Sequence, residues 1–255
     1  MPFLQAEAVT MMASAFRRLE GAIERPQRVA YRDSFVFRYT NKGIHEALIQ
    51  KLARNISGLN AVAVLISTGY VQEAGVLFRT LDEIQEDILF LATAEMEEGK
   101  TERHQKYLDA FYAESVFARP EGTLDIPKPN LLPRKKIRAH TFKGIGADVN
   151  ESQVLAASES LGTAYSGYVH AASENIMDMY GGDPPHFNLN GMLGTPWIES
   201  CTNDAENYVY RGLMATVVIA QAFGDLSLME ALYGFLGRYE RANGHPGPPN
   251  APLKT

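Results

Sequence analysis

Residues 66–91 decide the fold class, and they read ISTGYVQEAGVLFRTLDEIQEDILFL. Apolar side chains recur in this stretch at intervals of three and four residues, at Ile66, Tyr70, Ala74, Leu77, Leu81, Ile84, Ile88 and Leu91. This spacing places them on one face of a helix with 3.6 residues per turn. The stretch therefore predicts a long amphipathic helix.

The 13 prolines divide the rest of the chain. Three long stretches contain none, residues 27–119, 134–183 and 197–245. Proline breaks a helix by removing an N–H group and by clashing with the preceding turn, so helices can run in these stretches. The apolar residues of 154–176 keep helical spacing, and Asn150 is a suitable cap before them. They predict a second long helix.

Shorter helices are predicted from apolar spacing and from capping residues. Residues 213–220 and 228–235 have helical spacing. Ser227 precedes Glu230 by three residues, a capping box that starts the last helix. Two further helices are predicted, one over 6–24 and one over 101–117.

Loops and domain limits complete the prediction. Residues 120–146 and 181–196 are rich in proline or glycine and are predicted to be loops. Residues 31–39 alternate weakly between apolar and polar and are interpreted as an extended connector. We expect one all-α helical-bundle domain over 1–242, with six or seven helices and two long antiparallel core helices. A Gly/Pro-rich disordered tail is expected over 243–255.

The composition is that of an ordinary globular protein. The chain has 255 residues, 45% of them hydrophobic, and a net charge of −6 from 24 Lys+Arg and 30 Asp+Glu, which excludes disorder for most of its length. No apolar run reaches the roughly 18 residues that span a bilayer, so no membrane partner is expected. The single cysteine, Cys201, cannot form an internal disulfide, which favours a cytoplasmic location. We expect Cys201 to be a buried small hydrophobe.

The long helix at 66–91 carries polar residues opposite its apolar face: Gln72, Arg79, Glu83 and Glu86. Arg79 and Glu83 are four residues apart and can form an ion pair. The simplest interpretation is a solvated face with a pair of small energetic value. Glu73 falls within the apolar arc, so its carboxylate is expected to point inward, where it needs a partner. Glu73 is therefore a candidate ligand-binding residue.

The second long helix is predicted to have a polar stripe that contains Thr163, Ser166 and His170. Histidine changes its charge near neutral pH, which makes His170 a candidate for acid–base chemistry. A structural hydrogen bond to a neighbouring carboxylate is the alternative. His170 and Glu174 are only half of a metal site, and Glu-x-x-His pairs are absent, so neither a metal nor another cofactor is expected.

Residues 127–147 form a basic segment without any acidic residue, in which His140 accompanies Lys128, Arg134, Lys135, Lys136, Arg138 and Lys143. Such a run could contact phosphate groups. A solvated loop that balances an acidic surface explains it equally well.

Two motifs resemble a known group of proteins. They are LISTGYVQEAGVLFRTLDE at 65–83 and YSGYVHAAS at 165–173, which is followed by IMDMYGGDPP at 176–185. They resemble signatures of a large group of uncharacterised all-helical bacterial proteins that look distantly related to the HEPN (higher eukaryote and prokaryote nucleotide-binding) domain. The resemblance covers about residues 40–235. It implies a bacterial helical protein with a role in defence or stress and no assigned biochemistry.

Some HEPN relatives cut RNA without a metal ion. Their motif is an arginine that is followed, after four to six further residues, by a histidine. The resemblance maps that histidine onto His170, but residues 163–165 contain no arginine. Arg38 and His45 have the spacing of this motif, but they lie before the long helix predicted over 66–91. In a ribonuclease mechanism, Arg79 or Arg38 would stabilise a phosphorane while His170 moves the 2′-hydroxyl proton.

Two other functions remain open. In the first, a non-catalytic interaction module, Arg79, Glu83 and His170 form a polar network that joins the two long helices. In the second, residues 181–196 close a nucleotide or small-molecule pocket. The candidate catalytic residues are His170, Arg79 and Glu83. The candidate ligand-binding residues are Glu73, Tyr165, Ser166, Tyr180, Asp183 and His186. A homodimer is a further expectation, and RNA or a nucleotide is the candidate ligand.

Overall fold

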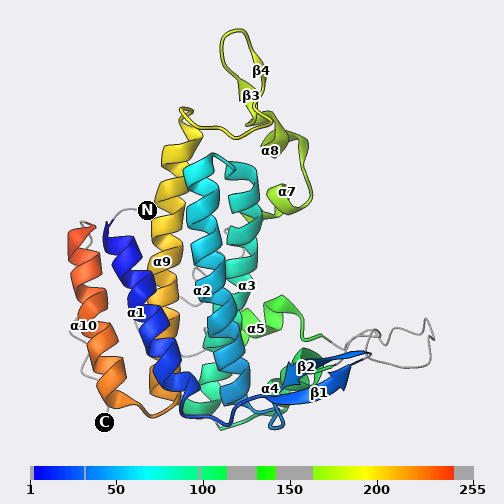
Figure 1. Ribbon diagram of the computed structural model, residues 1–255, viewed down its shortest axis with the longest axis vertical. Helices are drawn as coiled ribbons and strands as arrows, with labels where there is room; N and C mark the ends of the chain where they lie inside the picture. The colour runs from blue at the N-terminus through cyan, green and yellow to red at the C-terminus, as the bar shows by residue number, and fades with distance from the viewer. Residues whose placement is uncertain (1–2, 32, 97–98, 114–130, 142–162, 244–255) are drawn as a thin grey trace.

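The computed structural model describes residues 3–31, 33–96, 99–113, 131–141 and 163–243. Five long helices form a bundle along the long axis of the molecule (Figure 1), namely α1 (Phe3–Glu20), α2 (Ile44–Thr68), α3 (Val71–Met96), α9 (Trp197–Ala222) and α10 (Leu226–Ala242). α9 packs against the other four. The predicted all-α helical bundle is confirmed.

The helix predicted over 66–91 is divided between two helices. Gly69 has a left-handed backbone (φ 87°) and caps α2, its N–H group bonding to Ile66 O at 3.1 Å. Left-handed glycine ends many helices because it has no Cβ to clash with the preceding turn. A Cβ on Gly69 would also lie 2.7 Å from the backbone nitrogen of Met192. The chain therefore reverses at Gly69, and Ile66 belongs to α2.

The second long helix, predicted over 154–176, is not continuous in its described part, residues 163–176. That part contains helical residues at 163–164, then α7 (Ser166–Val169) and α8 (Ser173–Met177), which are separated by Ala171 with a positive φ of 50°. Neither short helix contains a buried residue. A long helix follows Pro196, where α9 runs for 26 residues and includes the predicted short helix at 213–220. The core helices α2, α3 and α9 are thus the long ones.

The shorter elements also differ from the sequence prediction. The expected connector at 31–39 is part of an antiparallel hairpin of β1 (Gln27–Tyr31) and β2 (Ser34–Arg38). α4 (Glu102–Phe111) begins after Thr101 as expected and ends at Phe111, before residue 117. The remaining elements are α5 (Arg134–Thr141), inside the expected loop, and a second hairpin of β3 (Tyr180–Gly181) and β4 (His186–Phe187).

The last helix begins slightly earlier than predicted. Asp225 caps α10, and its side chain accepts a hydrogen bond from Leu228 N at 3.1 Å. Ser227 therefore lies inside the helix. Asp225 also receives two hydrogen bonds of 2.6 Å from the Arg18 guanidinium, which joins α10 to α1.

A cluster of buried charges fastens α5 to the bundle, and we call it the α3–α5 charge cluster. Glu86 on α3 accepts hydrogen bonds of 2.7 Å from both Arg134 and Arg138. Asp87 pairs with Arg134 and, at 2.7 Å, with Lys51 of α2. Both carboxylate side chains are less than a tenth exposed. The prediction of a solvated face on α3 is therefore wrong at Glu86, because α5 covers it.

Some predictions fall outside the described residues. These are the helix start at Asn150, the lysines Lys128 and Lys143, and all of the expected tail after Asn243. Within the described residues, none of the helices combines the length and apolar character that crossing a bilayer requires.

Removing one arginine of the charge cluster should be costly. We expect Arg138→Ala to lower the free energy of unfolding by about 3–5 kcal/mol, because it leaves the Glu86 carboxylate buried with fewer partners. Arg17→Ala is the control, since its partner Glu20 lies on the exposed surface and the change should cost less than about 1 kcal/mol. Urea denaturation measures both. Equal effects would show that the cluster does not stabilise the docking of α5.

Candidate functional site

The predicted catalytic residues line a single cavity of about 250 Å³, which we call the α3–α7 cavity. α3 provides three of its lining residues, and α7 with its C-terminal cap provides the other three: Arg79, Thr80, Glu83, Ser166, Val169 and His170. The structure thus places Arg79, Glu83, Ser166 and His170 around one space, although they are separated by more than 80 positions in sequence. Neither Glu83 nor His170 is buried, so solvent reaches the cavity.

Arg79 is the cation of the cavity. Its Nη2 atom lies 2.7 Å from Glu83 Oε1, one helical turn away, as the spacing predicts. The Arg79 side chain is 21% exposed, but its Nη1 atom is buried and has no hydrogen-bond partner among the residues that the structure describes. Glu83 therefore orients the guanidinium and leaves N–H groups for another acceptor. A planar guanidinium of this kind suits an oxyanion.

His170 lies at the C-terminal end of α7 and is exposed. Its backbone N–H donates to Ser166 O at 3.1 Å, which closes the turn that places both side chains on the cavity. In the described part of the chain, we find neither a hydrogen bond nor an ion pair for its imidazole. The alternative of a structural histidine bonded to a carboxylate therefore has no support within these residues.

A close contact holds α7 against α3. A Cβ on Gly75 would lie 2.6 Å from the ring of Tyr168, so the ring packs directly on the α3 backbone. Gln72 Nε2 donates to Asn175 O at 2.7 Å, just beyond α7. The Tyr165 ring packs edge-on against Phe78 at 5.3 Å between centroids. The two tyrosines of the YSGYVH motif thus anchor α7, while Ser166 and His170 on its other side reach the cavity.

Tyr165 contributes to packing rather than to the cavity. It lines a separate recess of only about 40 Å³, together with Tyr168 and Asp204. Burial, and then the nearby Asp204 carboxylate, raise the pKa of the Tyr165 phenol, so it stays protonated at neutral pH. In the same recess, burial and the Asp204 charge raise the pKa of the Cys201 thiol to about 12. Cys201 is buried, as predicted, and it is not a thiolate at neutral pH.

Several predicted ligand-binding residues lie away from the cavity. Tyr180, Asp183 and His186 are exposed on the β3–β4 hairpin, which extends beyond the end of the bundle (Figure 1), and none of them lines the α3–α7 cavity. Glu73 is exposed, so the prediction that it points inward is wrong. Glu73 lies at the same angle around the α3 axis as the buried Leu91. It belongs to the first turn of α3, however, where that side of the helix is exposed to solvent.

The structure also bears on two other hypotheses from the sequence, the polar network between two long helices and the role of His45. Arg79 and Glu83 belong to one helix and His170 is not on a long helix, so the proposed network between two long helices is not observed in the described residues. His45, the other candidate histidine, packs its ring on Phe223 at 4.3 Å and contacts Ala222 O at 3.3 Å. It therefore joins α2 to the end of α9.

Sequence reasoning missed the α3–α5 charge cluster. Its signal was present in the spacing of Arg134 and Arg138, which lie one turn apart and match the adjacent carboxylates Glu86 and Asp87. Arg134 of the cluster also donates through Nη2 to the backbone oxygen of Glu83 at 2.9 Å. α5 thus begins beside Glu83, whose side chain lines the α3–α7 cavity.

The Gly75 contact yields a stability prediction. We expect Gly75→Ala to lower the free energy of unfolding by about 1–3 kcal/mol, because the new methyl group overlaps the Tyr168 ring. Hydrogen exchange of the 166–177 amides should also become faster. Gly234→Ala is a matched control in α10, where a Cβ meets nothing within 4 Å, and it should be neutral or stabilising. Unchanged exchange in the Gly75 variant would contradict the anchoring role.

Comparison with known proteins provides no template for this site. A scan against protein-family models, a search of curated proteins and a search of solved structures each found no match. The chemistry of the α3–α7 cavity residues is therefore the basis for assigning a function.

Proposed function

We propose that the α3–α7 cavity binds a phosphodiester group of RNA and that the protein cleaves it without a metal ion. One observation carries the proposal: Arg79 and His170, from distant parts of the chain, line the same solvent-accessible cavity. A guanidinium with unused N–H groups stabilises charge on phosphate oxygens, and an imidazole transfers protons near neutral pH.

The proposed step is an internal transesterification. His170 takes the proton of the ribose 2′-hydroxyl, and the 2′ oxygen attacks the adjacent phosphorus. Arg79 stabilises the negative charge that develops on the non-bridging oxygens. The bond from phosphorus to the 5′ oxygen breaks, leaving a 2′,3′-cyclic phosphate and a 5′-hydroxyl. The 5′ oxygen takes a proton from water and His170 returns its proton to water, so the step is balanced.

Glu83 and Ser166 have supporting roles in this scheme. Glu83 is a positioning residue, because it holds Arg79 at 2.7 Å from within the same helix. The Ser166 hydroxyl lines the cavity and can donate a hydrogen bond to a phosphate oxygen. Within the described residues, no group of three or more His, Cys, Asp or Glu side chains is suitably placed for a metal ion.

The size of the cavity favours a phosphate group over a whole nucleotide. Its volume of about 250 Å³ lies below the range of about 300–1,000 Å³ that is typical of pockets enclosing a drug-sized ligand. The base and the following nucleotides would therefore remain outside, along the protein surface. Lys135 and Lys136 are exposed on α5, which begins beside Glu83, and they provide positive charge along that surface.

The wider assignment is part of the same proposal. A distant relationship to HEPN domains is supported by the helical bundle and by the arginine and histidine that share the cavity. A bacterial origin and a role in defence or stress follow from that relationship alone. We also propose a cytoplasmic location, consistent with a single, reduced cysteine, and a homodimer, consistent with the exposed apolar side chains of Leu189, Leu193 and Trp197.

The proposal predicts an RNA cleavage activity that depends on His170. Purified protein in EDTA should cut single-stranded RNA, and His170→Ala should lower the rate about 100-fold or more. Arg79→Ala should have a similar effect. A substrate with 2′-deoxyribose at the cleaved position should be inert. His186→Ala removes an exposed histidine outside the cavity and is the matched control.

The RNA cleavage assay has one outcome that supports the proposal and two that overturn it. Cyclic-phosphate products that disappear with His170→Ala but persist with His186→Ala support the proposal. Equal activity of the wild type and His170→Ala would indicate a contaminating nuclease and would overturn it, as would a wild type that leaves RNA intact.

The exposed lysines of α5 should contribute to RNA binding. We expect Lys135→Ala/Lys136→Ala to weaken RNA binding and to reduce its salt dependence, because two phosphate contacts are lost. Lys42→Ala, an exposed lysine before α2, should leave both unchanged. Fluorescence anisotropy with an RNA oligomer, repeated over a series of salt concentrations, measures the effect. An unaltered salt slope would exclude α5 from the RNA path.

A further inference from the structure

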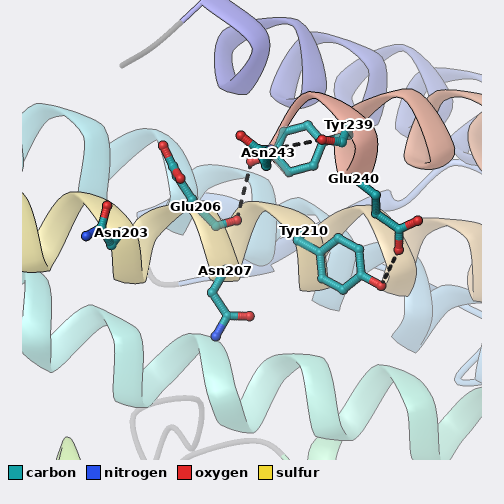
Figure 2. A pocket seen from close by; sticks show the side chains of 7 residues that line it. All are labelled: Asn203, Glu206, Asn207, Tyr210, Tyr239, Glu240 and Asn243. Carbon is teal, nitrogen blue, oxygen red and sulfur yellow. Dashed lines mark hydrogen bonds between the residues drawn. The ribbon is translucent and has the colours of Figure 1, made fainter. Parts of the chain in front are cut away.

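A second and larger pocket, of about 680 Å³, lies between α9 and the end of α10 (Figure 2). We call it the α9–α10 pocket, and it shares no residue with the α3–α7 cavity. All seven of its lining side chains are polar or tyrosine: Asn203, Glu206, Asn207, Tyr210, Tyr239, Glu240 and Asn243. The four from α9 are spaced by three, one and three residues, so they form a single stripe on that helix.

Hydrogen bonds hold this arrangement in place. Tyr210 donates to Glu240 Oε1 at 2.7 Å and joins the two helices. Tyr239 donates to the backbone oxygen of Glu206 at 3.3 Å, and Asn243 Nδ2 donates to Tyr239 O at 3.0 Å. Burial and the hydrogen bond to Glu240 raise the pKa of the Tyr210 phenol to about 12, so it remains a donor at neutral pH.

Glu240 has an unused hydrogen-bonding atom. The residue is only 5% exposed, and its Oε2 atom has no hydrogen-bond partner among the described residues. A buried carboxylate oxygen without a partner is costly, because it has lost its water without gaining another donor. A ligand that provides N–H groups would remove that cost.

The charges around the pocket favour a cation. Its lining includes two carboxylates, Glu206 and Glu240, and no lysine or arginine. α10 also ends here, with Asn243 as its C-cap, so the negative end of the helix dipole faces the same region. The basic residue of the last turn, Arg241, is exposed and does not line the pocket.

The shape of the pocket indicates the class of cation. The stripe from Asn203 to Tyr210 covers about 10 Å along α9 at 1.5 Å per residue, with side-chain oxygens along its length. A single ammonium group could meet only one end of it. The described residues hold no cluster of three metal-type ligands either. We propose that the α9–α10 pocket binds a linear polyamine, with one ammonium group at Glu240 and another at the Glu206 end.

Isothermal titration calorimetry with spermidine tests the assignment. The wild type should bind spermidine with a stoichiometry of one. Butylamine, which has a single ammonium group, should bind at least about tenfold more weakly than spermidine. Glu240→Gln should weaken spermidine binding about tenfold or more, because it removes the buried charge. Glu206→Gln, at a partly exposed position, should weaken it in the same direction without the risk of unfolding.

Glu230→Gln is the matched control, since it makes the same change at an exposed position of α10 outside the pocket. It should bind spermidine as the wild type does, and circular dichroism should confirm that every variant is folded. Failure of the wild type to bind spermidine would overturn the proposal. Equal affinity of the Glu230, Glu206 and Glu240 variants would also overturn it, because binding would then reflect only net charge. Either outcome leaves the ribonuclease proposal unaffected.

Discussion

The arrangement of helices depends on three buried carboxylates of α3, each of which requires a cation from another part of the chain. Asp82 pairs with Arg211 of α9 at 2.6 Å, Glu86 with the arginines of α5, and Asp87 with Lys51 of α2. A buried charge without a partner costs several kcal/mol, so alternative packings that separate these pairs are disfavoured. These pairs tie α3 to α2, α5 and α9.

The same helix supports the candidate site. Other helices cover the buried carboxylates of α3. The side chains of Arg79 and Glu83 instead face the cavity beside the short α7, and they remain partly exposed. Gly75 lets α7 approach closely enough for His170 to reach the same cavity. The motif at 65–83 thus provides the surface on which α7 packs and the cation of the cavity, Arg79. The motif at 165–173 provides the Tyr168 ring that anchors α7 and the His170 imidazole. This division explains why polar groups are concentrated in both motifs.

The two proposed sites favour ligands of opposite charge, which the net charge of −6 does not reveal. The α3–α7 cavity offers Arg79 and the nearby lysines of α5 to an anion. The α9–α10 pocket offers Glu206 and Glu240 at a helix C-terminus to a cation. Polyamines and RNA associate strongly through charge, but the two pockets share no lining residue. Each site can therefore be tested by substitutions that leave the other intact.

Local signals in the sequence were enough for the all-α class, for the helix start after Thr101, and for the pairing of Arg79 with Glu83, because these depend on residues within one or two turns. Periodicity failed at Gly69, where a left-handed glycine reverses the chain without changing the apolar spacing. Only the tertiary structure decided that Glu86 is buried and Glu73 exposed, since burial depends on which helix covers a face. It also decided that His170 lies beside Arg79, because that proximity comes from the packing of Tyr168 on Gly75 and from no local rule.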